Sequence, residues 1–208
     1  MPISRVVNQP MVLIVKDKQK YPTVAAWLAA AKAQPGEITY ASSGDGSPPH
    51  LAGVMFEART NTKQLHVPYR GGALVNSDTI AGTVEVMFAV VPEAVPHVLS
   101  GKLHALGMMS RPTRSPVFPQ VPTMAESGIA DLNLSAWMAL LAPAKILHAN
   151  IDQLNRAVHI AFETEQTVKL AESSIEVSTS SPEEAQRLIT KDIKVHAEHV
   201  KAAGLPTQ

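Results

Sequence analysis

The feature that most constrains the fold of this chain is the alternation of short apolar runs with segments of helical periodicity. Two runs, MVLIV at 11–15 and EITYAS at 37–42, have the length and composition of buried strands. The segment between them, PTVAAWLAAAKAQPG, is rich in alanine and is stopped by Pro35-Gly36, which predicts a helix. Strands that alternate with helices in this way predict an α/β fold with a mostly parallel sheet.

The alternation continues beyond residue 42. Further strands are expected at 63–69, 83–90, 102–110 and 134–143, and further helices at 47–58, 70–82, 91–100 and 150–173. The proline-rich segment 111–128 is expected to wrap over the surface. A last helix is the best signalled, because Ser181 is a good N-cap, Glu184 completes a capping box and Gly204 follows the expected end.

Composition excludes several classes of function. The 18 Lys and Arg residues balance 18 Asp and Glu residues, so the net charge does not favour nucleic acid or an anionic membrane as a partner. The absence of cysteine removes disulfides, thiol nucleophiles and Cys-type zinc sites. No apolar run reaches the roughly 18 residues that a spanning helix needs. Near the N-terminus the only apolar run is Met11–Val15, so no signal peptide is predicted in this chain.

The stretch YASSGDGSPPH, residues 40–50, joins an expected strand to an expected helix. It lacks the G-x-S-x-G order of a nucleophile elbow, the lysine of a Walker A loop and the third glycine of a dinucleotide fingerprint. Its glycines permit a tight turn. The hydroxyls of Ser42, Ser43 and Ser47, with amides at a helix start, could donate to an oxyanion. Two interpretations stay open here, an anion-binding loop and a well-built turn without a ligand.

A second strand–loop–helix unit follows at HVPYRGGA, where Arg70 carries a planar guanidinium suited to a carboxylate. Because ligands lie off the carboxyl ends of strands in open α/β sheets, two such units favour anion binding. The eight histidines include His196 and His199 on the last helix, but no third ligand has recognisable spacing, so no metal is predicted. Glu126 is interpreted as a charge at a helix N-terminus, since a catalytic acid would need a partner.

Together, YASSGDGSPPHLAG, HVPYRGGA, TVEVMF, GKLHALGMMS, RSPVFPQVPTMAESG and SAWMALLAP closely resemble the Bug family, the periplasmic solute-binding receptors of tripartite tricarboxylate transporters. The resemblance implies an α/β, type II periplasmic-binding-protein-like fold, a two-lobed Venus flytrap, of which this chain holds one complete lobe and part of the other. The implied domains are a crossover or hinge segment at 1–11, lobe two at 12–136, and the C-terminal part of lobe one at 137–208.

The resemblance also implies the ligand-binding residues. By motif, the first ligand loop comprises Ser42, Ser43, Gly44 and Ser47, and the second comprises Tyr69, Arg70, Gly71 and Gly72. Phe88 and Ala89 are expected to line the cleft, and Trp137 to lie near the crossing into lobe one. Ala89 stands where the family often has Asp, Ala139 where a Gly usually follows the Trp, and Leu74 where a Pro is common. These departures leave the preferred carboxylate open.

The implied function is capture of a small carboxylate (a dicarboxylate, a tricarboxylate or an acidic amino acid) for membrane transporter subunits, with no enzymatic reaction and no cofactor. Members of the family are longer, with an export signal and an N-terminal segment that completes the site. The expected compartment is the periplasm, or the cytoplasm for a natively truncated product. An incomplete lobe leaves apolar faces uncovered, so a homodimer through residues 137–208 is expected. The alternatives are an interaction or scaffold protein derived from the receptor lobe and, ranked last, a hydrolase using Ser43 with a histidine.

Overall fold

The computed structural model describes residues 1–109, 114–130, 132–172, 175–202 and 204. The strands within these residues are β1 (Pro2–Val15), β2 (Thr39–Ser42), β3 (Leu65–Pro68), β4 (Val86–Val90), β5 (His104–Met108), β6 (Ser135–Leu141) and β7 (Glu176–Val177). The helices are α1 (Val24–Ala33), α2 (Pro48–Thr60), α3 (Gly72–Ala81), α4 (Val91–Leu99), α5 (His148–Ala161), α6 (Glu165–Glu172) and α7 (Pro182–Ala202).

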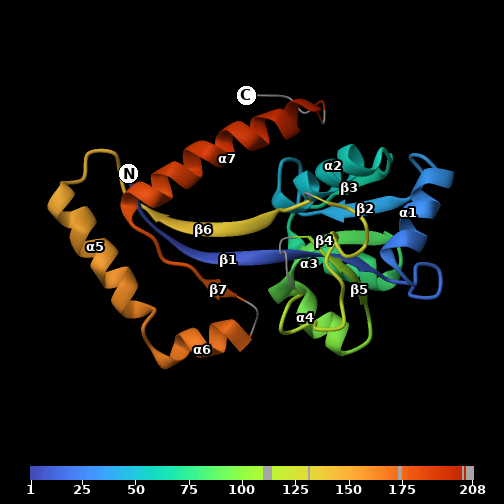
Figure 1. Cartoon of the computed structure of the whole chain (residues 1–208), viewed down its shortest axis with the longest axis horizontal. Helices are drawn as coiled ribbons and strands as arrows, with labels where there is room; N and C mark the ends of the chain where they lie inside the picture. Colours follow the sequence, from blue (N-terminus) through green and yellow to red (C-terminus); the bar gives the residue numbers. More distant parts are fainter. Residues whose placement is uncertain (110–113, 131, 173–174, 203, 205–208) are drawn as a thin grey trace.

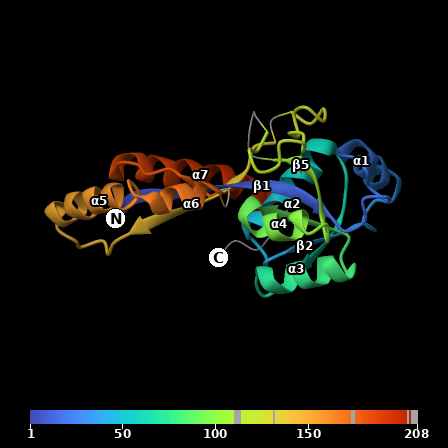
Figure 2. The same ribbon diagram turned by 90° about the horizontal axis from the view of Figure 1, so that it is seen from below.

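The long strand β1 joins two bodies (Figure 1). Its first part, Pro2–Pro10, pairs with β6, and its last part, Met11–Val15, pairs with β4. The partner therefore changes between Pro10 and Met11. Figure 2 shows the molecule elongated along this strand. The smaller body contains the first part of β1 with α5, α6 and α7, and the larger body contains its last part with α1 to α4. Residues 2–10, which lie within the expected crossover or hinge segment 1–11, thus belong to a sheet of their own with β6 and β7.

The sheet of the larger body has the strand order β3-β2-β4-β1-β5. β2 runs parallel to β3 and to β4, as predicted. β1 runs antiparallel to every strand with which it pairs, so the prediction of a mostly parallel sheet is wrong for this strand. β1 enters this sheet from the smaller body and lies between β4 and β5, antiparallel to both.

Both faces of this sheet are covered, which explains the continuous apolar run in β1. Met11, Leu13 and Val15 lie in one buried cluster, while Val12 and Ile14 lie in another. Successive side chains of a strand point to opposite faces, so a strand buried on both sides shows no alternation. The first cluster is centred on the aromatic residues Trp27, Tyr40, Phe56 and Phe88.

The smaller body departs from the prediction in one place. The helix expected at 150–173 is two helices, α5 and α6, separated at residues 162–164. Thr164 directly precedes α6, and its carbonyl accepts from the Thr167 N–H at 2.9 Å, which marks the new start. The prediction for α7 is confirmed: the Glu184 N–H donates to Ser181 Oγ at 3.1 Å, and the Ser181 N–H donates to Glu184 Oε2 at 2.9 Å. Gly204 follows with φ +65°.

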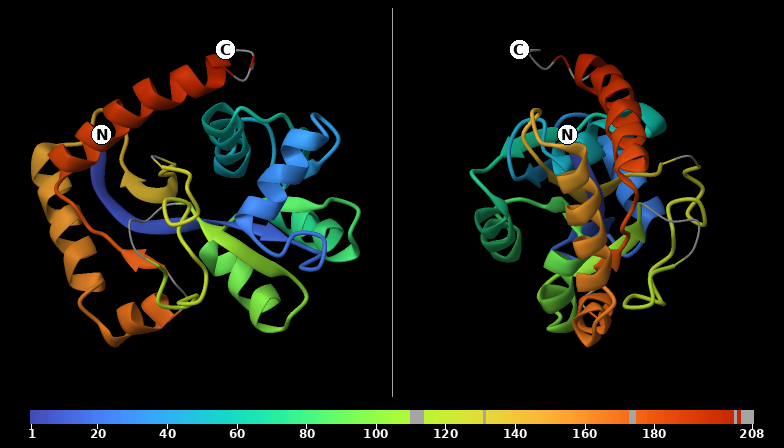
Figure 3. Two further views of the ribbon diagram at one scale, coloured as in Figure 1. Left: turned by 45° about the vertical axis from the view of Figure 1, so that its right-hand side comes forward. Right: turned by 90° about the vertical axis from the view of Figure 1, so that its left-hand side faces the viewer.

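Helix α7 reaches from the smaller body to the larger one. It begins near the N-terminus of the chain and ends beside α2, as the left view of Figure 3 shows. Val200, close to its end, packs against the first buried cluster. Two connections therefore link the bodies: the strands β1 and β6, and the helix α7, which packs against the larger body.

Candidate functional site

Three helices begin where three parallel strands end. α2 follows β2, α3 follows β3, and α4 begins at the residue directly after β4. Because β2, β3 and β4 are parallel, their carboxyl ends lie at one edge of the sheet. That edge is also where β1 enters, since Met11 lies opposite Val90. The predicted ligand loops therefore face the junction between the two bodies, which is the position expected for a ligand in an open α/β sheet.

The two predicted loops are brought together. The N–H of Tyr69 donates to the carbonyl of Ser42 at 2.9 Å. Gly44 has φ +130°, a conformation that favours glycine, and its Cβ position lies in ordinary contact with the Tyr69 carbonyl oxygen, at 3.5 Å. We call residues 42–47 the first loop and residues 69–72 the second loop.

The first loop is ordered mostly by its own hydrogen bonds. Ser42 is fully buried, and its hydroxyl donates to the Gly44 carbonyl at 3.1 Å while accepting from the Gly44 N–H at 3.2 Å. Ser47 occupies the N-cap of α2, but its hydroxyl makes no capping bond and is buried without a partner among the described residues. Pro48 and Pro49 have no N–H, so the start of α2 donates less than the sequence argument assumed. Donors for an anion therefore come mainly from loop amides.

The second loop combines a free cation with a helix start. Gly71 is the N-cap of α3 with φ +109°, so the first amides of that helix follow it directly. Arg70 is exposed and makes no ion pair within the described part of the chain. The Tyr69 hydroxyl donates to Asp78 Oδ2 at 2.8 Å, and the pKa of Tyr69 is raised to about 12, chiefly by burial. This tyrosine therefore fixes the loop to α3 as a neutral phenol.

A carboxylate that the sequence argument missed lies at the start of α3. The two carboxylate oxygens of Glu93 lie 3.4 and 3.5 Å from the Cβ position of Gly72. Glu93 is in the first turn of α4, and burial raises its pKa above the ordinary value. In the sequence, Glu93 stands out as an acidic residue three positions after the end of β4, in a helix that starts at the same edge of the sheet. Its charge opposes a second carboxylate at this point.

Two histidines were also missed. Asp45, His50 and His66 each place a ligand atom within 4.8 Å of the others. The two imidazole rings are stacked, with centroids 3.7 Å apart and planes at 13°. A metal ion binds an imidazole in the ring plane, and one ion cannot lie in the planes of two parallel rings at bonding distance. Although Ser42, His66 and Asp45 follow the order of a hydrolase triad, Ser42 is fully buried and is not presented for attack.

Two predicted site residues, Phe88 and Ala89, lie elsewhere than expected. Phe88 is 1% exposed and packs among the core aromatic rings, and Ala89 is 3% exposed within the second buried cluster. Both belong to β4, whose two faces are covered, so neither side chain lines a cleft in this structure. Trp137 lies on β6 opposite Asn8, and its indole N–H donates to Asp192 Oδ2 of α7 at 2.6 Å. Trp137, expected near the crossing into lobe one, thus lies beside the first part of β1 with its donor already used.

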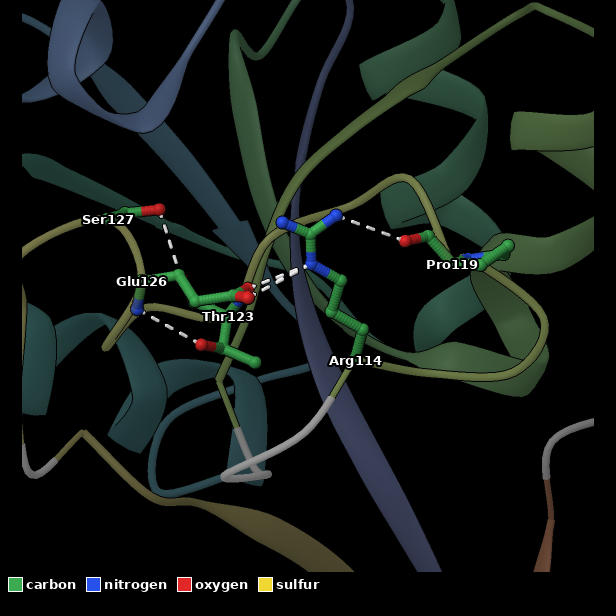
Figure 4. Close-up of polar contacts among 5 residues, drawn as sticks. All are labelled: Arg114, Pro119, Thr123, Glu126 and Ser127. Atoms are coloured by element: carbon green, nitrogen blue, oxygen red, sulfur yellow. Dashed lines mark hydrogen bonds and ion pairs between the residues drawn. The ribbon is translucent and has the colours of Figure 1, made fainter.

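Glu126 lies in a turn rather than at a helix N-terminus, and its charge is paired (Figure 4). Arg114 Nε donates to both of its oxygens, at 3.0 and 3.1 Å, and the Thr123 N–H donates at 2.7 Å. These bonds lower the pKa of Glu126. These bonds connect Arg114, at the start of the described part of the proline-rich segment, to the turn at 123–128 near its end. Residues 111–113 lie outside the described residues.

The rings of His196 and His199, the two histidines noted on the last helix, are 5.8 Å apart.

The family described as tripartite tricarboxylate transporter family receptor matches residues 1–205. Protein BugT of Bordetella pertussis is 32% identical over 204 residues, which are 98% of this chain and 62% of BugT. Among solved structures, the R. palustris protein Rpa4515 with adipate has a TM-score of 0.90 and 27% identity, covering 98% of this chain and 68% of that one. The periplasmic binding protein BugD has a TM-score of 0.89 and 26% identity, covering 100% of this chain and 70% of that one.

These matches establish the fold as that of a periplasmic binding protein. The chain spans less than two thirds of the length of BugT. None of the helices among the described residues is long and apolar enough to cross a membrane.

Proposed function

Since the chain belongs to the tripartite tricarboxylate transporter receptor family, we propose that it captures a small carboxylate and presents it to a membrane transporter of that kind. The family is one of receptors, so the protein is a binding protein and not an enzyme. The observation that carries the proposal is the joining of the first and second loops by the Tyr69–Ser42 bond at the edge where the two bodies meet.

The proposed site binds through a few local groups. The N–H groups of Ser43 and Asp45 make no hydrogen bond within the described residues, and Arg70 makes no ion pair there. Hydrogen bonds to a charged group contribute roughly 1.5–3 kcal/mol each, so a few of them reach micromolar affinity after the cost of association. In this proposal Ser42 supports the loop, while Ser43, Gly44, Ser47 and the second loop surround the carboxylate.

The ligand class is supported by one solved relative. Rpa4515 was solved with adipate, a dicarboxylate, and it is 27% identical to this chain. The carboxylates of Asp45 and Glu93 lie at the same edge as Arg70, and they disfavour a high negative charge on the ligand. We therefore place dicarboxylates and acidic amino acids before tricarboxylates.

A thermal-shift titration tests the proposal. The panel is adipate, succinate, malate, citrate, aspartate, glutamate and benzoate. A ligand that binds only the folded state stabilises it by about 2.7 kcal/mol at a hundredfold excess over Kd. We expect a saturable shift with one of these acids, lost in Arg70→Ala and weakened in Ser43→Ala, which removes the hydroxyl but keeps the backbone N–H. Arg187→Ala, which removes an exposed guanidinium from α7, is the matched control and keeps the shift. A cooperatively folded chain that responds to none of the acids contradicts the proposal.

The periplasm and the transporter subunits are part of the same proposal. The solved relatives include proteins described as a periplasmic transporter and a periplasmic binding protein. We divide the chain as 1–11 for the crossing, 12–136 for the ligand lobe and 137–208 for the part of the other lobe, and the change of partner of β1 at Pro10–Met11 supports this division. Cell fractionation of the natively expressed protein tests the compartment.

One observation favours a second candidate function, an interaction or scaffold protein that self-associates through residues 137–208. Within the described residues β6 pairs only with β1, and its Met138, Leu140 and Leu141 are 57%, 41% and 59% exposed. An apolar strand with one free edge is a template for pairing with another chain. Light scattering of a dimer that Met138→Lys dissociates, with Leu99→Lys on α4 as the exposed apolar control, supports it. A monomer at micromolar concentration contradicts it.

A further inference from the structure

Two histidines from different elements form one buried unit against the first loop. His50 comes from the first turn of α2 and His66 from β3, and their rings stack at 3.7 Å. His50 is 4% exposed, and the side chain of His66 is 17% exposed. The ring of Tyr40, on the neighbouring strand β2, lies 4.9 Å from that of His66. The pair is therefore held between the sheet and α2.

Each imidazole holds a different point of the first loop. Nε2 of His66 lies 2.6 Å from Oγ of Ser42, where the loop begins. Nδ1 of His50 accepts a hydrogen bond from the N–H of Gly46 at 3.1 Å, close to where the loop ends. A ring nitrogen that accepts from an N–H carries no proton, so neutral His50 is protonated at Nε2. The two bonds fix both ends of the loop.

The tip of the loop completes the arrangement. Oδ1 of Asp45 is 3.5 Å from Nδ1 of His66 and 3.7 Å from Nδ1 of His50. Burial, with the neighbouring His50 as a smaller cause, lowers the pKa of His66 to about 4, and burial lowers the pKa of His50 as well. Both rings are therefore neutral at pH 7. The Ser42 hydroxyl has a single proton, which it donates to the Gly44 carbonyl, so Nε2 of neutral His66 carries the ring proton and donates it to Ser42 Oγ.

We infer that His66 is a positioning residue for ligand binding, because its bond to Ser42, supported by the stack on His50, holds the first loop in one arrangement. The ligand part of this inference rests on the proposed function. The N–H groups of Ser43 and Asp45, which make no hydrogen bond within the described residues, lie between the two points that the histidines hold. A loop ordered before binding loses less conformational entropy when it closes on a carboxylate, and the affinity is higher for that reason.

Two substitutions separate positioning from packing. The amide of His66→Gln keeps a polar group for Ser42 but loses the ring. The ring of His66→Phe keeps the stack and the burial but has no hydrogen-bonding atom. If His66 only packs, the loop is better ordered and binds more tightly in His66→Phe than in His66→Gln. If His66 positions the loop, His66→Gln is the better of the two. The same two substitutions at His104, on β5 where it pairs with the far end of β1, are the matched controls.

The first measurement needs no ligand. Hydrogen–deuterium exchange of peptides covering the first loop is compared between the wild type and the variants. We expect about tenfold faster exchange of the loop amides in His66→Phe and a change of less than about threefold in His66→Gln. Ser42→Ala removes this bond together with the two bonds between Ser42 Oγ and Gly44, so its loop exchange is expected to be at least as fast as in His66→Phe. It keeps the test decisive where a His66 variant fails to fold.

The second measurement is the Kd of adipate by calorimetry. We expect a loss of about tenfold in His66→Phe and of less than about threefold in His66→Gln. The inference is overturned if the loop exchanges as slowly in His66→Phe as in His66→Gln. It is also overturned if His66→Phe binds adipate as tightly as His66→Gln does. The wild type could bind no acid of the panel while the loop still exchanges faster in His66→Phe than in His66→Gln. In that case the proposed carboxylate function fails, and the ordering of the loop by His66 stands.

Discussion

The N–H of Tyr69 donates to the carbonyl of Ser42 at 2.9 Å, where Tyr69 is the residue after the last paired residue of β3 and Ser42 is the last paired residue of β2. This bond keeps the first and second loops side by side at the point where each leaves its strand. A ligand that contacts one loop therefore lies within reach of the other.

Gly53→Ala is expected to destabilise the larger body. A Cβ on Gly53 would lie 2.3 Å from Cε2 and 2.5 Å from Cζ of Tyr40, whose ring is buried in the core. The ring cannot move without disturbing its neighbours, and overpacking of this kind costs about 1–3 kcal/mol. Urea denaturation measures the cost. Ala58→Gly on the exposed side of the same helix is the control, with an expected cost of about 0.5–1 kcal/mol. A Gly53→Ala cost below that of the control contradicts the packing described for Tyr40.

Ser181→Ala is expected to lower the free energy of unfolding by about 1 kcal/mol, because the capping box of α7 loses the oxygen that accepts from the Glu184 N–H. Glu184→Gln keeps an acceptor for the Ser181 N–H and is expected to be nearly neutral. Circular dichroism during urea denaturation reports both variants. Equal stabilities of the two variants would show that the box contributes nothing.

Glu93→Gln is expected to gain stability relative to the wild type as the pH rises from about 4 to about 7. Burial raises the pKa of Glu93 above 4.5, so the folded chain holds this proton more tightly than the unfolded chain. Above that value the unfolded state releases its proton first, and the free energy of unfolding of the wild type falls as the pH rises. The effect is small because the side chain is partly exposed.

Glu126→Gln provides the control for this pH dependence, because its sign is opposite. Hydrogen bonds from Thr123 and Arg114 lower the pKa of Glu126, so its contribution is present above 4.5 and is lost as the pH falls through the lowered value. The variant is therefore expected to lose stability relative to the wild type as the pH rises. Urea denaturation at both pH values decides, and the same sign in both variants would refute the assignment for Glu93.

Asp192→Ala is expected to loosen α7 from β6, since the indole N–H of Trp137 loses its acceptor. The expected cost is about 1 kcal/mol, with a red shift of tryptophan emission. Asp192→Asn keeps an acceptor oxygen and is expected to retain most of the stability. Identical emission and stability in the two variants would mean that this bond does not hold the helix.

Much of the local structure could be predicted from the chain alone. The continuous run MVLIV indicated a strand covered on both faces, and the capping box at Ser181 and Glu184 marked the start of α7, because these patterns depend only on neighbouring residues. The direction of β1 could not be predicted, because an apolar run specifies burial but not the orientation of the neighbouring strands.

The contacts of the candidate site depend on the tertiary structure. His66 lies opposite Tyr40 in the register of β2 and β3, and α2 returns His50 onto the same ring. Phe88, which the family motif placed in a cleft, lies in the core because both faces of β4 are covered. The sequence by itself determined the elements, the glycine loops and the family, since these follow from local backbone preferences and short motifs. Only the packing of distant segments decided which loops meet and which histidines stack, because strand pairing brings together residues that have no relation along the chain.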